Sequence, residues 1–252
     1  MKKFLFLAAG SMLGLALALP PVSVAKAAEL KVLAGGSMTA VLNELGPQFE
    51  RTSGHKLVIQ FDSTPNLIKK INSEPFDLGI VPVDVFRDTT AAAHFIRPAV
   101  SIAHVGYGIA VRAGAPKPDV STREALKKTL LDAKSIAFVP TSAAGSYISN
   151  VFERLGIGEA MKAKTKPQAT TGQISEAVAR GDAELGVFLV NVLKAPGVDL
   201  AGPFPIELQQ ELVFTAAVAA DSKEAAGARA LINYLTSQEA IAVIRKLGLS
   251  PG

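Results

Sequence analysis

The segment Lys31-Val32-Leu33-Ala34-Gly35-Gly36-Ser37-Met38 is typical of a strand that ends in a glycine turn and continues directly into a helix. Gly35 and Gly36 let the backbone turn sharply and approach a ligand closely. Ser37 adds a hydroxyl, and the helix that follows directs its unpaired N–H groups and the positive end of its dipole at the turn. These residues predict an anion-binding turn that needs no cationic side chain.

The N-terminus has the pattern of an export signal. Two lysines precede an apolar run from Phe4 to Leu19, and Ala25-Lys26-Ala27 fits a small-x-small cleavage site. The pattern predicts a signal peptide over residues 1–27 and a mature chain that starts at Ala28. The run is shorter than the ~20 apolar residues that a spanning helix needs, and no later stretch qualifies. We therefore expect a mature protein in the periplasm that does not insert into the membrane.

Charge and cysteine content narrow the class of partner. The predicted signal peptide holds three lysines, so its removal lowers the formal charge from +4 to +1 and leaves little support for nucleic-acid binding. The absence of cysteine excludes disulfides, thiolate metal sites and a lipid-modified cysteine. The three histidines are scattered without metal-ligand spacing. We expect no cofactor, no metal and a monomeric chain.

Short apolar runs alternate with helical patterns in the first part of the mature chain. Strands are predicted at Leu30–Ala34, Leu57–Phe61 and Asp77–Val81, and helices are predicted between them. Gly46-Pro47 is expected to kink or split the first helix, and Thr64-Pro65 is expected to start the second with an N-cap threonine. Such a β-α-β-α-β series implies a parallel sheet whose ligands lie beyond the carboxyl ends of its strands. Ser37 and the Asp62-Ser63-Thr64 turn lie at such ends.

A second series follows the long apolar segment Ala99–Val111. It contains strands at 136–139 and 185–190, a small-residue turn at Thr141–Ser146, and a helix opened by Thr170-Thr171-Gly172. Capping boxes are predicted at Ser121/Glu124, Asp221/Glu224 and Thr236/Glu239, and the last two flank helices that follow a strand at 212–218. The pattern predicts an α/β chain of two lobes, the first formed by 28–105 plus 215–252 and the second by 106–214.

The motifs along this chain resemble those of type II periplasmic binding proteins, and the chain is similar to the molybdate-binding branch of that family. The resemblance covers essentially the whole mature chain and is carried by Ala34–Met38, Phe61–Leu67, Glu74–Leu78, Ala144–Tyr147 and Val178–Gly186. It implies a clamshell in which each lobe is a mostly parallel sheet flanked by helices. It also implies a small anion as ligand and an ABC permease in the inner membrane as partner.

The resemblance places the family's ligand contacts on particular residues. They fall on Ser37, on Ser63 or Thr64, on the N–H of Ala144 and on the N–H of Thr171 or a neighbour; the complete predicted set is Gly36, Ser37, Ser63, Thr64, Ala144, Gly145, Ser146, Thr171 and Leu189. Two departures favour an anion other than molybdate. Leu189 replaces a tyrosine, and Pro82 cannot donate a backbone hydrogen bond. The anion is expected to be a molybdate-like oxyanion or a compact carboxylate.

The same residues allow other interpretations. Ser37 and Thr64 could simply cap helices, and the segment from Ala143 to Ser146 could be an ordinary helix start. A related branch of the family contains isomerases of the tricarboxylate aconitate, which need a base to move a proton between carbons. His104, Asp62 and Tyr147 are the candidates for that base. A scavenger or sensor that never meets a transporter is a third possibility.

Overall fold

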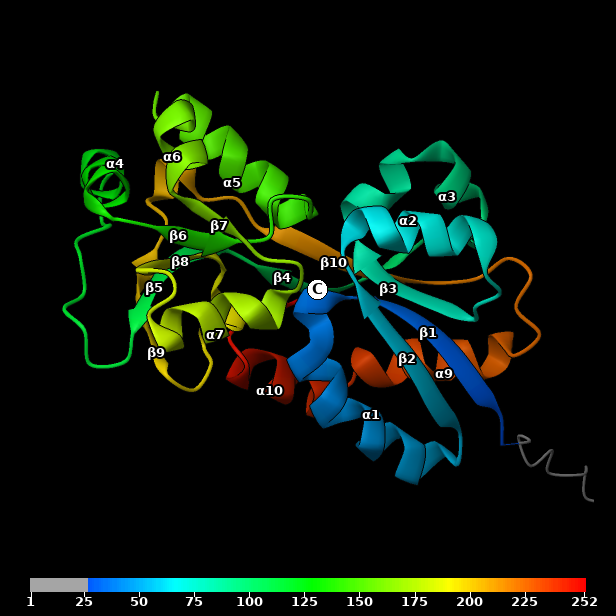
Figure 1. The fold of residues 1–252 in the computed structure, drawn as a ribbon. Coiled ribbons are helices and arrows are strands. Elements are labelled where there is room, and N and C mark those ends of the chain that lie inside the picture. The colour runs from blue at the N-terminus through cyan, green and yellow to red at the C-terminus, as the bar shows by residue number, and fades with distance from the viewer. Residues whose placement is uncertain (1–26) are drawn as a thin grey trace, which may run out of the picture.

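The computed structural model describes residues 27–252, and Figure 1 shows them as two helix-flanked sheets side by side. The predicted two-lobed α/β architecture is confirmed. All but the last residue of the predicted signal peptide lies outside the described residues. Within residues 27–252, the helices are too short or too polar to cross a membrane.

The first sheet has the strand order β11-β4-β10-β3-β1-β2. Its strands are β1 (Glu29–Gly35), β2 (Lys56–Asp62), β3 (Leu78–Pro82), β4 (Val100–Val105), β10 (Leu212–Val218) and β11 (Ser250–Pro251). As predicted, β1 pairs in parallel with both β2 and β3. β10 runs antiparallel to β3 and β4, so a strand from the end of the chain completes a sheet begun at its start.

Helices cover both faces of the first sheet. η1 (Gly36–Met38) leads into α1 (Thr39–Ser53), and the other helical segments are α2 (Thr64–Ser73), η2 (Val83–Arg87), α3 (Thr89–Ala93), α9 (Ala225–Leu235) and α10 (Gln238–Lys246). Figure 1 shows α2 and α3 on one face and α1 and α9 on the other. Val32 and Ala34 belong to the core that includes α1, whereas Leu33 belongs to the core that includes α2. This alternation is the period-two pattern of a strand buried on both faces.

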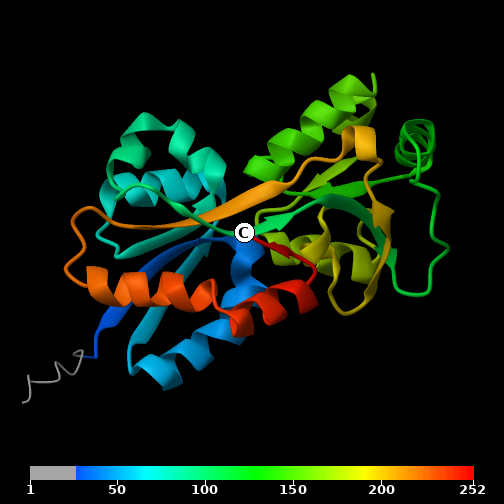
Figure 2. The ribbon, with the colours of Figure 1, turned by 180° about the vertical axis from the view of Figure 1, so that it is seen from behind.

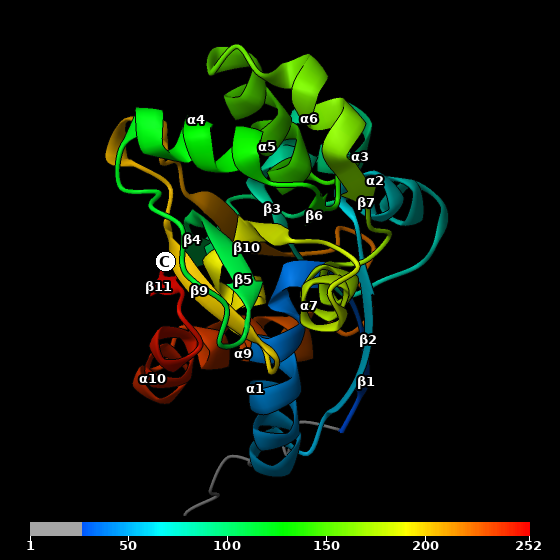
Figure 3. The ribbon, with the colours of Figure 1, turned by 60° about the vertical axis from the view of Figure 1, so that its left-hand side comes forward.

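The second sheet has the order β7-β6-β8-β5-β9. Its elements are β5 (Tyr107–Arg112), α4 (Arg123–Asp132), β6 (Ile136–Phe138), α5 (Ala143–Arg154), α6 (Gly158–Lys164), β7 (Thr165–Pro167), α7 (Thr171–Arg180), β8 (Leu185–Leu189), α8 (Val190–Leu193), β9 (Val198–Pro203) and η3 (Ile206–Leu208). β6 is parallel to β7 and β8. Figure 3 shows α4, α5 and α6 together above this sheet, with α7 beside the start of α1.

The chain passes between the two sheets twice. The apolar segment predicted at 99–111 divides at Gly106 into β4 and β5, one in each sheet. The return passage runs from β9 through η3 to β10, and Figure 2 shows β10 reaching from one lobe toward the other. The lobe boundaries predicted from the sequence stay a prediction.

Some predicted helix details are wrong for identifiable reasons. α1 continues through Gly46 and Pro47. Pro47 lies on the exposed side of the helix, where water can satisfy the carbonyl that a proline leaves unpaired. Four N-caps differ from the predicted residues. Ser63 for α2, Thr122 for α4 and Ser237 for α10 each lie one residue away from the predicted position, and Glu224 for α9 lies three residues away. Neighbouring Ser, Thr and acidic residues give the same local signal, so the tertiary packing selects among them.

Candidate functional site

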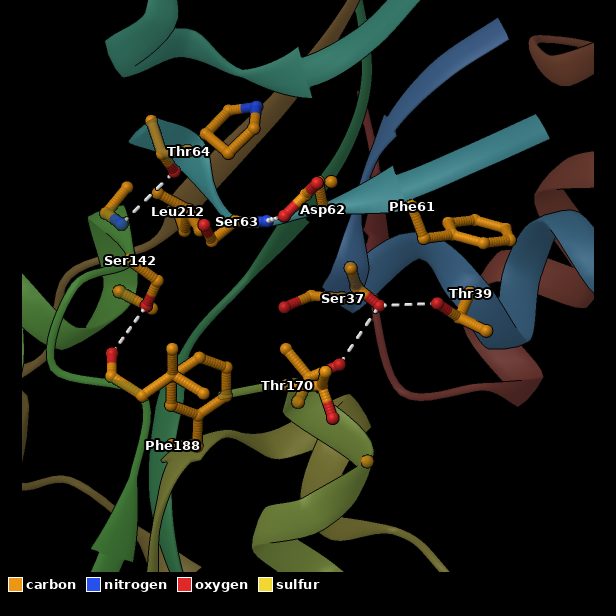
Figure 4. A pocket seen from close by; sticks show the side chains of 18 of the residues that line it. Ser37, Thr39, Phe61, Asp62, Ser63, Thr64, Ser142, Thr170, Phe188 and Leu212 are labelled. Carbon is orange, nitrogen blue, oxygen red and sulfur yellow. Dashed lines mark hydrogen bonds between the residues drawn. The ribbon is translucent and has the colours of Figure 1, made fainter. Parts of the chain in front are cut away.

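A cavity of about 390 Å³ lies between the two lobes. The first lobe supplies Gly35, Gly36, Ser37, Thr39, Phe61, Asp62, Ser63, Thr64, Pro82, Leu212 and Phe214. The second supplies Val139, Ser142, Ala143, Ala144, Ala169, Thr170, Thr171, Gly172 and Phe188. Figure 4 shows these side chains arranged around a common space. None of the lining residues that the structure describes is a lysine, arginine or histidine.

Four helix N-termini converge on this cavity, two from each lobe. They are the starts of η1–α1, α2, α5 and α7, each of which contributes residues to the lining. The first N–H groups of a helix have no partner within the helix, and the helix dipole places partial positive charge there. The helix dipoles, and those first N–H groups that no side chain occupies, therefore suit an anion, and the described lining residues place no cationic side chain against it.

The first lobe directs two serine hydroxyls into the cavity. Ser37 is 8% exposed, and Figure 4 shows its hydroxyl and that of Ser63 pointing into the space. Neither hydroxyl has a hydrogen-bond partner among the residues that the structure describes, and neither η1 nor α2 has a side-chain cap. The nearby Thr39 hydroxyl is engaged, because it donates to the Gly36 carbonyl over 2.7 Å. Ser37 and Ser63 are thus free to bind a ligand.

The second lobe uses its side chains to fix the helix starts. Ser142 Oγ accepts from the Gly145 N–H over 2.9 Å and donates to the Val139 carbonyl over 2.8 Å. A Cβ on Gly145 would lie 1.9 Å from that same carbonyl oxygen, so only glycine fits there. At α7 the Gln173 side chain accepts from the Thr170 N–H over 3.1 Å. These bonds hold α5 and α7 so that their first N–H groups face the cavity.

Three hydrogen bonds join the lobes directly beside the cavity. The Ala143 N–H donates to Thr64 Oγ1 over 3.2 Å. Thr171 Oγ1 donates to the Gly36 carbonyl over 3.2 Å. Asn191 Nδ2 donates to the Ser37 carbonyl over 2.7 Å, while its Oδ1 is buried without a partner among the described residues. The lobes are therefore closed on each other, and the Gly36-Ser37 turn is held from the opposite lobe.

Apolar side chains form much of the remaining wall. Phe61, Phe188, Phe214, Leu212, Pro82 and Val139 all line the cavity. A Cβ on Gly35 would lie 2.9 Å from the Phe214 ring, so this glycine makes room for an aromatic wall residue. Such a surface suits a ligand with a hydrocarbon part as well as charged oxygens.

Among the described residues that line the cavity, Asp62 is the one with an ionisable side chain. Its Oδ1 accepts from the Ser63 N–H over 2.8 Å and from Asn66 Nδ2 over 2.7 Å, and its Oδ2 lies 3.2 Å from the Lys70 ammonium. Burial raises the pKa of the Asp62 carboxyl, but these hydrogen bonds and the Lys70 charge outweigh burial and hold the pKa below its usual range. Asp62 is therefore ionised at neutral pH.

The structure brings together most of the residues predicted for the site. Gly36, Ser37, Ser63, Thr64, Ala144 and Thr171 line the cavity. Gly145, Ser146 and Leu189 do not. Gly145 packs on the Val139–Pro140 turn, Ser146 is exposed, and Leu189 is fully buried at the end of β8 opposite Tyr107. Which of these residues contact a ligand stays a prediction.

The three candidate bases are separated by the fold. Asp62 lines the cavity, whereas His104 and Tyr147 do not. His104 lies on β4, where its ring contacts Ser101 Oγ at 3.0 Å and Glu211 at 3.4 Å. The Tyr147 hydroxyl donates to the Leu208 carbonyl over 2.8 Å. Of the three candidate bases, Asp62 is therefore the one placed at this cavity.

Several lining residues escaped the sequence analysis. Phe188 lies beside the predicted Leu189, and because all of β8 is buried its sequence has no alternation to show which side chain faces the cavity. Leu212 and Phe214 come from the returning strand β10, which no local pattern connects to the first turn. Ser142 could have been found, since it precedes the predicted helix at 143 with the usual N-cap residue type.

Known proteins resemble the chain along nearly its whole length. Residues 30–250 match the family model of the bacterial extracellular solute-binding proteins. An aconitate isomerase from a Pseudomonas species is 33% identical over 233 residues, which cover 88% of this chain and 87% of the relative. A molybdate-binding protein from Azotobacter vinelandii is 28% identical over 236 residues, which cover 89% and 90%.

A solved structure confirms the fold. The periplasmic molybdate-binding protein of Azotobacter vinelandii superposes with a TM-score of 0.73 at 21% identity, covering 87% of this chain and 98% of that one. The family match includes both lobes and every helix start at the cavity. The chain belongs to the bacterial extracellular solute-binding protein family, and it resembles the molybdate-binding proteins in sequence and in fold, as predicted.

Proposed function

We propose that this protein is a periplasmic receptor that binds a small anion between its lobes and presents it to an ABC permease of the inner membrane. The observation that carries the proposal is the convergence of four helix N-termini on one cavity between the lobes, to which the described residues contribute no cationic side chain. Such N–H groups bind anionic oxygens through fixed dipoles. The molybdate-binding relatives support the same ligand class and the same location.

Binding would act through the equilibrium between open and closed lobes. An anion that contacts Ser37 and Ser63 on one side and the starts of α5 and α7 on the other has more partners when the lobes are closed. That difference in affinity favours the closed form, which the permease can then recognise. The two lobes, each built around one of the two sheets, are the two bodies of this movement.

The cavity favours a compact carboxylate over an inorganic oxyanion. Its volume of about 390 Å³ lies in the range of pockets for small organic ligands, roughly 300–1,000 Å³. Its aromatic and aliphatic walls can bury a carbon skeleton while the helix starts bind carboxylate oxygens. A tetrahedral oxyanion would leave those walls without contact.

Thermal unfolding with added ligands tests the ligand class. A ligand that binds only the folded protein adds about 2.7 kcal/mol to the unfolding free energy at about hundredfold excess over its Kd. We expect a raised Tm with at least one of citrate, aconitate, molybdate, tungstate, sulfate and phosphate. If neutral sugars raise the Tm and no anion does, the proposal is wrong.

An isomerase is the second candidate, and the similarity to an aconitate isomerase favours it. The geometry leaves Asp62 as the only one of the three candidate bases in the cavity wall. Its lowered pKa makes it a weak base at neutral pH. Incubation of purified protein with cis-aconitate, followed by ultraviolet absorbance, decides between the candidates. A receptor returns its ligand unchanged, whereas catalytic conversion that is lost in Asp62→Asn establishes the enzyme.

A further inference from the structure

We infer that the cavity selects an anion that carries a proton-donating hydroxyl, a hydroxycarboxylate, and that Asp62 is the residue that makes this selection. This inference rests on the proposed function, because it names the kind of anion that the same cavity binds. The wall of a cavity that otherwise presents hydrogen-bond donors contains one carboxylate, that of Asp62.

The contacts of Asp62 leave room for one more donor. Oδ1 already accepts from Ser63 and Asn66, but Oδ2 faces only the Lys70 ammonium at 3.2 Å. An ionised carboxylate has about four acceptor sites and no proton to give. The Asp62 side chain is 22% exposed, so it is not sealed away from a ligand. It also borders Ser63, whose hydroxyl points into the cavity.

This acceptor penalises ligands that consist only of acceptors. A ligand oxygen without a proton cannot hydrogen-bond to Asp62, and the two like charges repel each other. A ligand hydroxyl at the same place would donate to Oδ2 and form a hydrogen bond to a charged group. The donors elsewhere in the cavity would bind the carboxylates of the same molecule. The complete lining is therefore complementary to a hydroxyl and carboxylates together.

Lys70 explains why the donor is a hydroxyl and not a ligand ammonium. Its Nζ lies 3.2 Å from Asp62 Oδ2 and donates to Gln60 Oε1 over 2.8 Å, so the charge of Asp62 is already balanced by the protein. A ligand ammonium would be placed against that cation. A neutral hydroxyl adds a hydrogen bond without adding charge, and the apolar walls accommodate the carbon atoms that carry it.

Calorimetry with two ligands that differ by one hydroxyl tests the inference. Citrate and tricarballylate are both tricarboxylates, and at about pH 8 the carboxyl groups of both are ionised. We expect the intact protein to bind citrate at least about tenfold more tightly, the ratio expected for a hydrogen bond to a charged group. Malate, succinate and aspartate form a smaller series with a hydroxyl, a hydrogen or an ammonium at one position, and malate is expected to bind most tightly.

Asp62→Asn then assigns the selection to its residue. The amide can keep the bond to Ser63, but it is neutral and can donate, so the citrate to tricarballylate ratio should fall to within about threefold of unity. Asp182→Asn is the matched control, because Asp182 is an exposed carboxylate paired with Arg180 outside the cavity. Its ratio should equal that of the parent. A ratio that survives in Asp62→Asn overturns the assignment.

The comparison in the intact protein does not depend on whether Asp62→Asn folds. Equal affinity for citrate and tricarballylate, tighter binding of tricarballylate, or tighter binding of aspartate than of malate overturns the inference. The inference is also overturned if the protein binds molybdate or another inorganic oxyanion and binds no carboxylate. In each of these cases the anion receptor stands. Only the absence of binding by every anion overturns the proposed function as well.

Discussion

The two lobes build their halves of the cavity from similar residues but use them differently. Both place Ser or Thr at helix starts. In the first lobe, η1 and α2 begin without a side-chain cap, and the hydroxyls of Ser37 and Ser63 face the cavity. In the second lobe, the Ser142 hydroxyl caps α5, and Thr170 takes part in a capping box with Gln173. The same residue types have uncommitted hydroxyls that face the cavity on one side and serve as structural caps on the other.

Because of this difference, substitutions of the hydroxyl residues in the two lobes should have separate effects, one on affinity and the other on stability. A cap hydroxyl is already engaged in the folded protein, so its removal lowers the unfolding free energy. A free hydroxyl contributes only when a ligand arrives, so its removal lowers affinity instead. In the proposed function the second lobe contributes backbone N–H groups, whose position depends on the packing of the helix starts. Four substitutions test this comparison.

Gly145→Ala should have the largest effect. The added Cβ would lie 1.9 Å from the Val139 oxygen, a backbone atom that cannot move away as a flexible side chain could. We expect a loss of about 3 kcal/mol in unfolding free energy, at the upper end for overpacking. Gly172→Ala is the matched control at the other helix start of the second lobe, because a Cβ there has nothing within 4 Å. If urea unfolding shows equal stability for both variants, the inference that the start of α5 is tightly packed is wrong.

Ser37→Ala should lower affinity and leave stability unchanged. The lost hydrogen bond to an anion is worth about 2 kcal/mol, which weakens binding about thirtyfold. The Tm should stay that of the parent, because η1 has no side-chain cap. Calorimetry with the anion that gives the largest rise in Tm measures the first effect. Ser146→Ala is the control, since Ser146 is exposed outside the cavity. A lowered Tm with unchanged affinity would make Ser37 a structural residue.

The sequence predicts the first lobe's fold well because its signals are local. The turn at Gly35-Gly36, the strand before it and the parallel β1–β2–β3 unit all follow from residue order and spacing. The sequence does not show that the helix continues unsplit through Pro47, because the exposure of this residue, which lets water replace a lost hydrogen bond, is a property of the folded chain. The joining of β10 to β3 depends on residues more than a hundred positions apart, and no local pattern encodes it.

Residues of the site could be predicted from the sequence where a hydroxyl side chain directly follows the end of a predicted strand. Ser37, Ser63 and Thr64 satisfy this condition, and they line the cavity. Phe188 and Phe214 were not predictable, because an apolar residue in a buried strand carries no mark of which face meets a ligand. The role of Asn191 was also hidden. Its bond to the Ser37 carbonyl joins residues 154 positions apart and exists only when the lobes meet.

Ser142→Ala should lower stability and leave affinity nearly unchanged, which is the opposite of the result expected for Ser37→Ala. It removes an N-cap whose oxygen accepts from Gly145, so the unfolding free energy should fall by about 1 kcal/mol. Affinity should change little, because the hydroxyl is not available to a ligand. Ser237→Ala removes an equivalent cap in α10, where Ser237 accepts from Ala240, and should cost the same stability without touching the cavity. If Ser142→Ala weakens binding as strongly as Ser37→Ala, the two lobes do not differ as proposed.

Thr171→Val should have the smallest effect on affinity. It removes a hydroxyl of the second lobe that hydrogen-bonds to the first lobe beside the cavity. Valine keeps the shape of threonine but cannot donate to the Gly36 carbonyl, a bond of 3.2 Å that forms only when the lobes are closed. A neutral hydrogen bond of this kind is worth about 0.5 kcal/mol, so fewer molecules are closed and the apparent Kd rises about twofold, while the Tm is unchanged. Thr165→Val is the control, because that hydroxyl donates to Met161 within one lobe and its loss leaves closure unaffected. Small-angle scattering of the ligand-free protein should show a larger radius of gyration for Thr171→Val alone. A loss of affinity as large as that of Ser37→Ala, with no change in scattering, would instead mean that Thr171 binds the ligand through its hydroxyl, and both lobes would then offer hydroxyls to the anion.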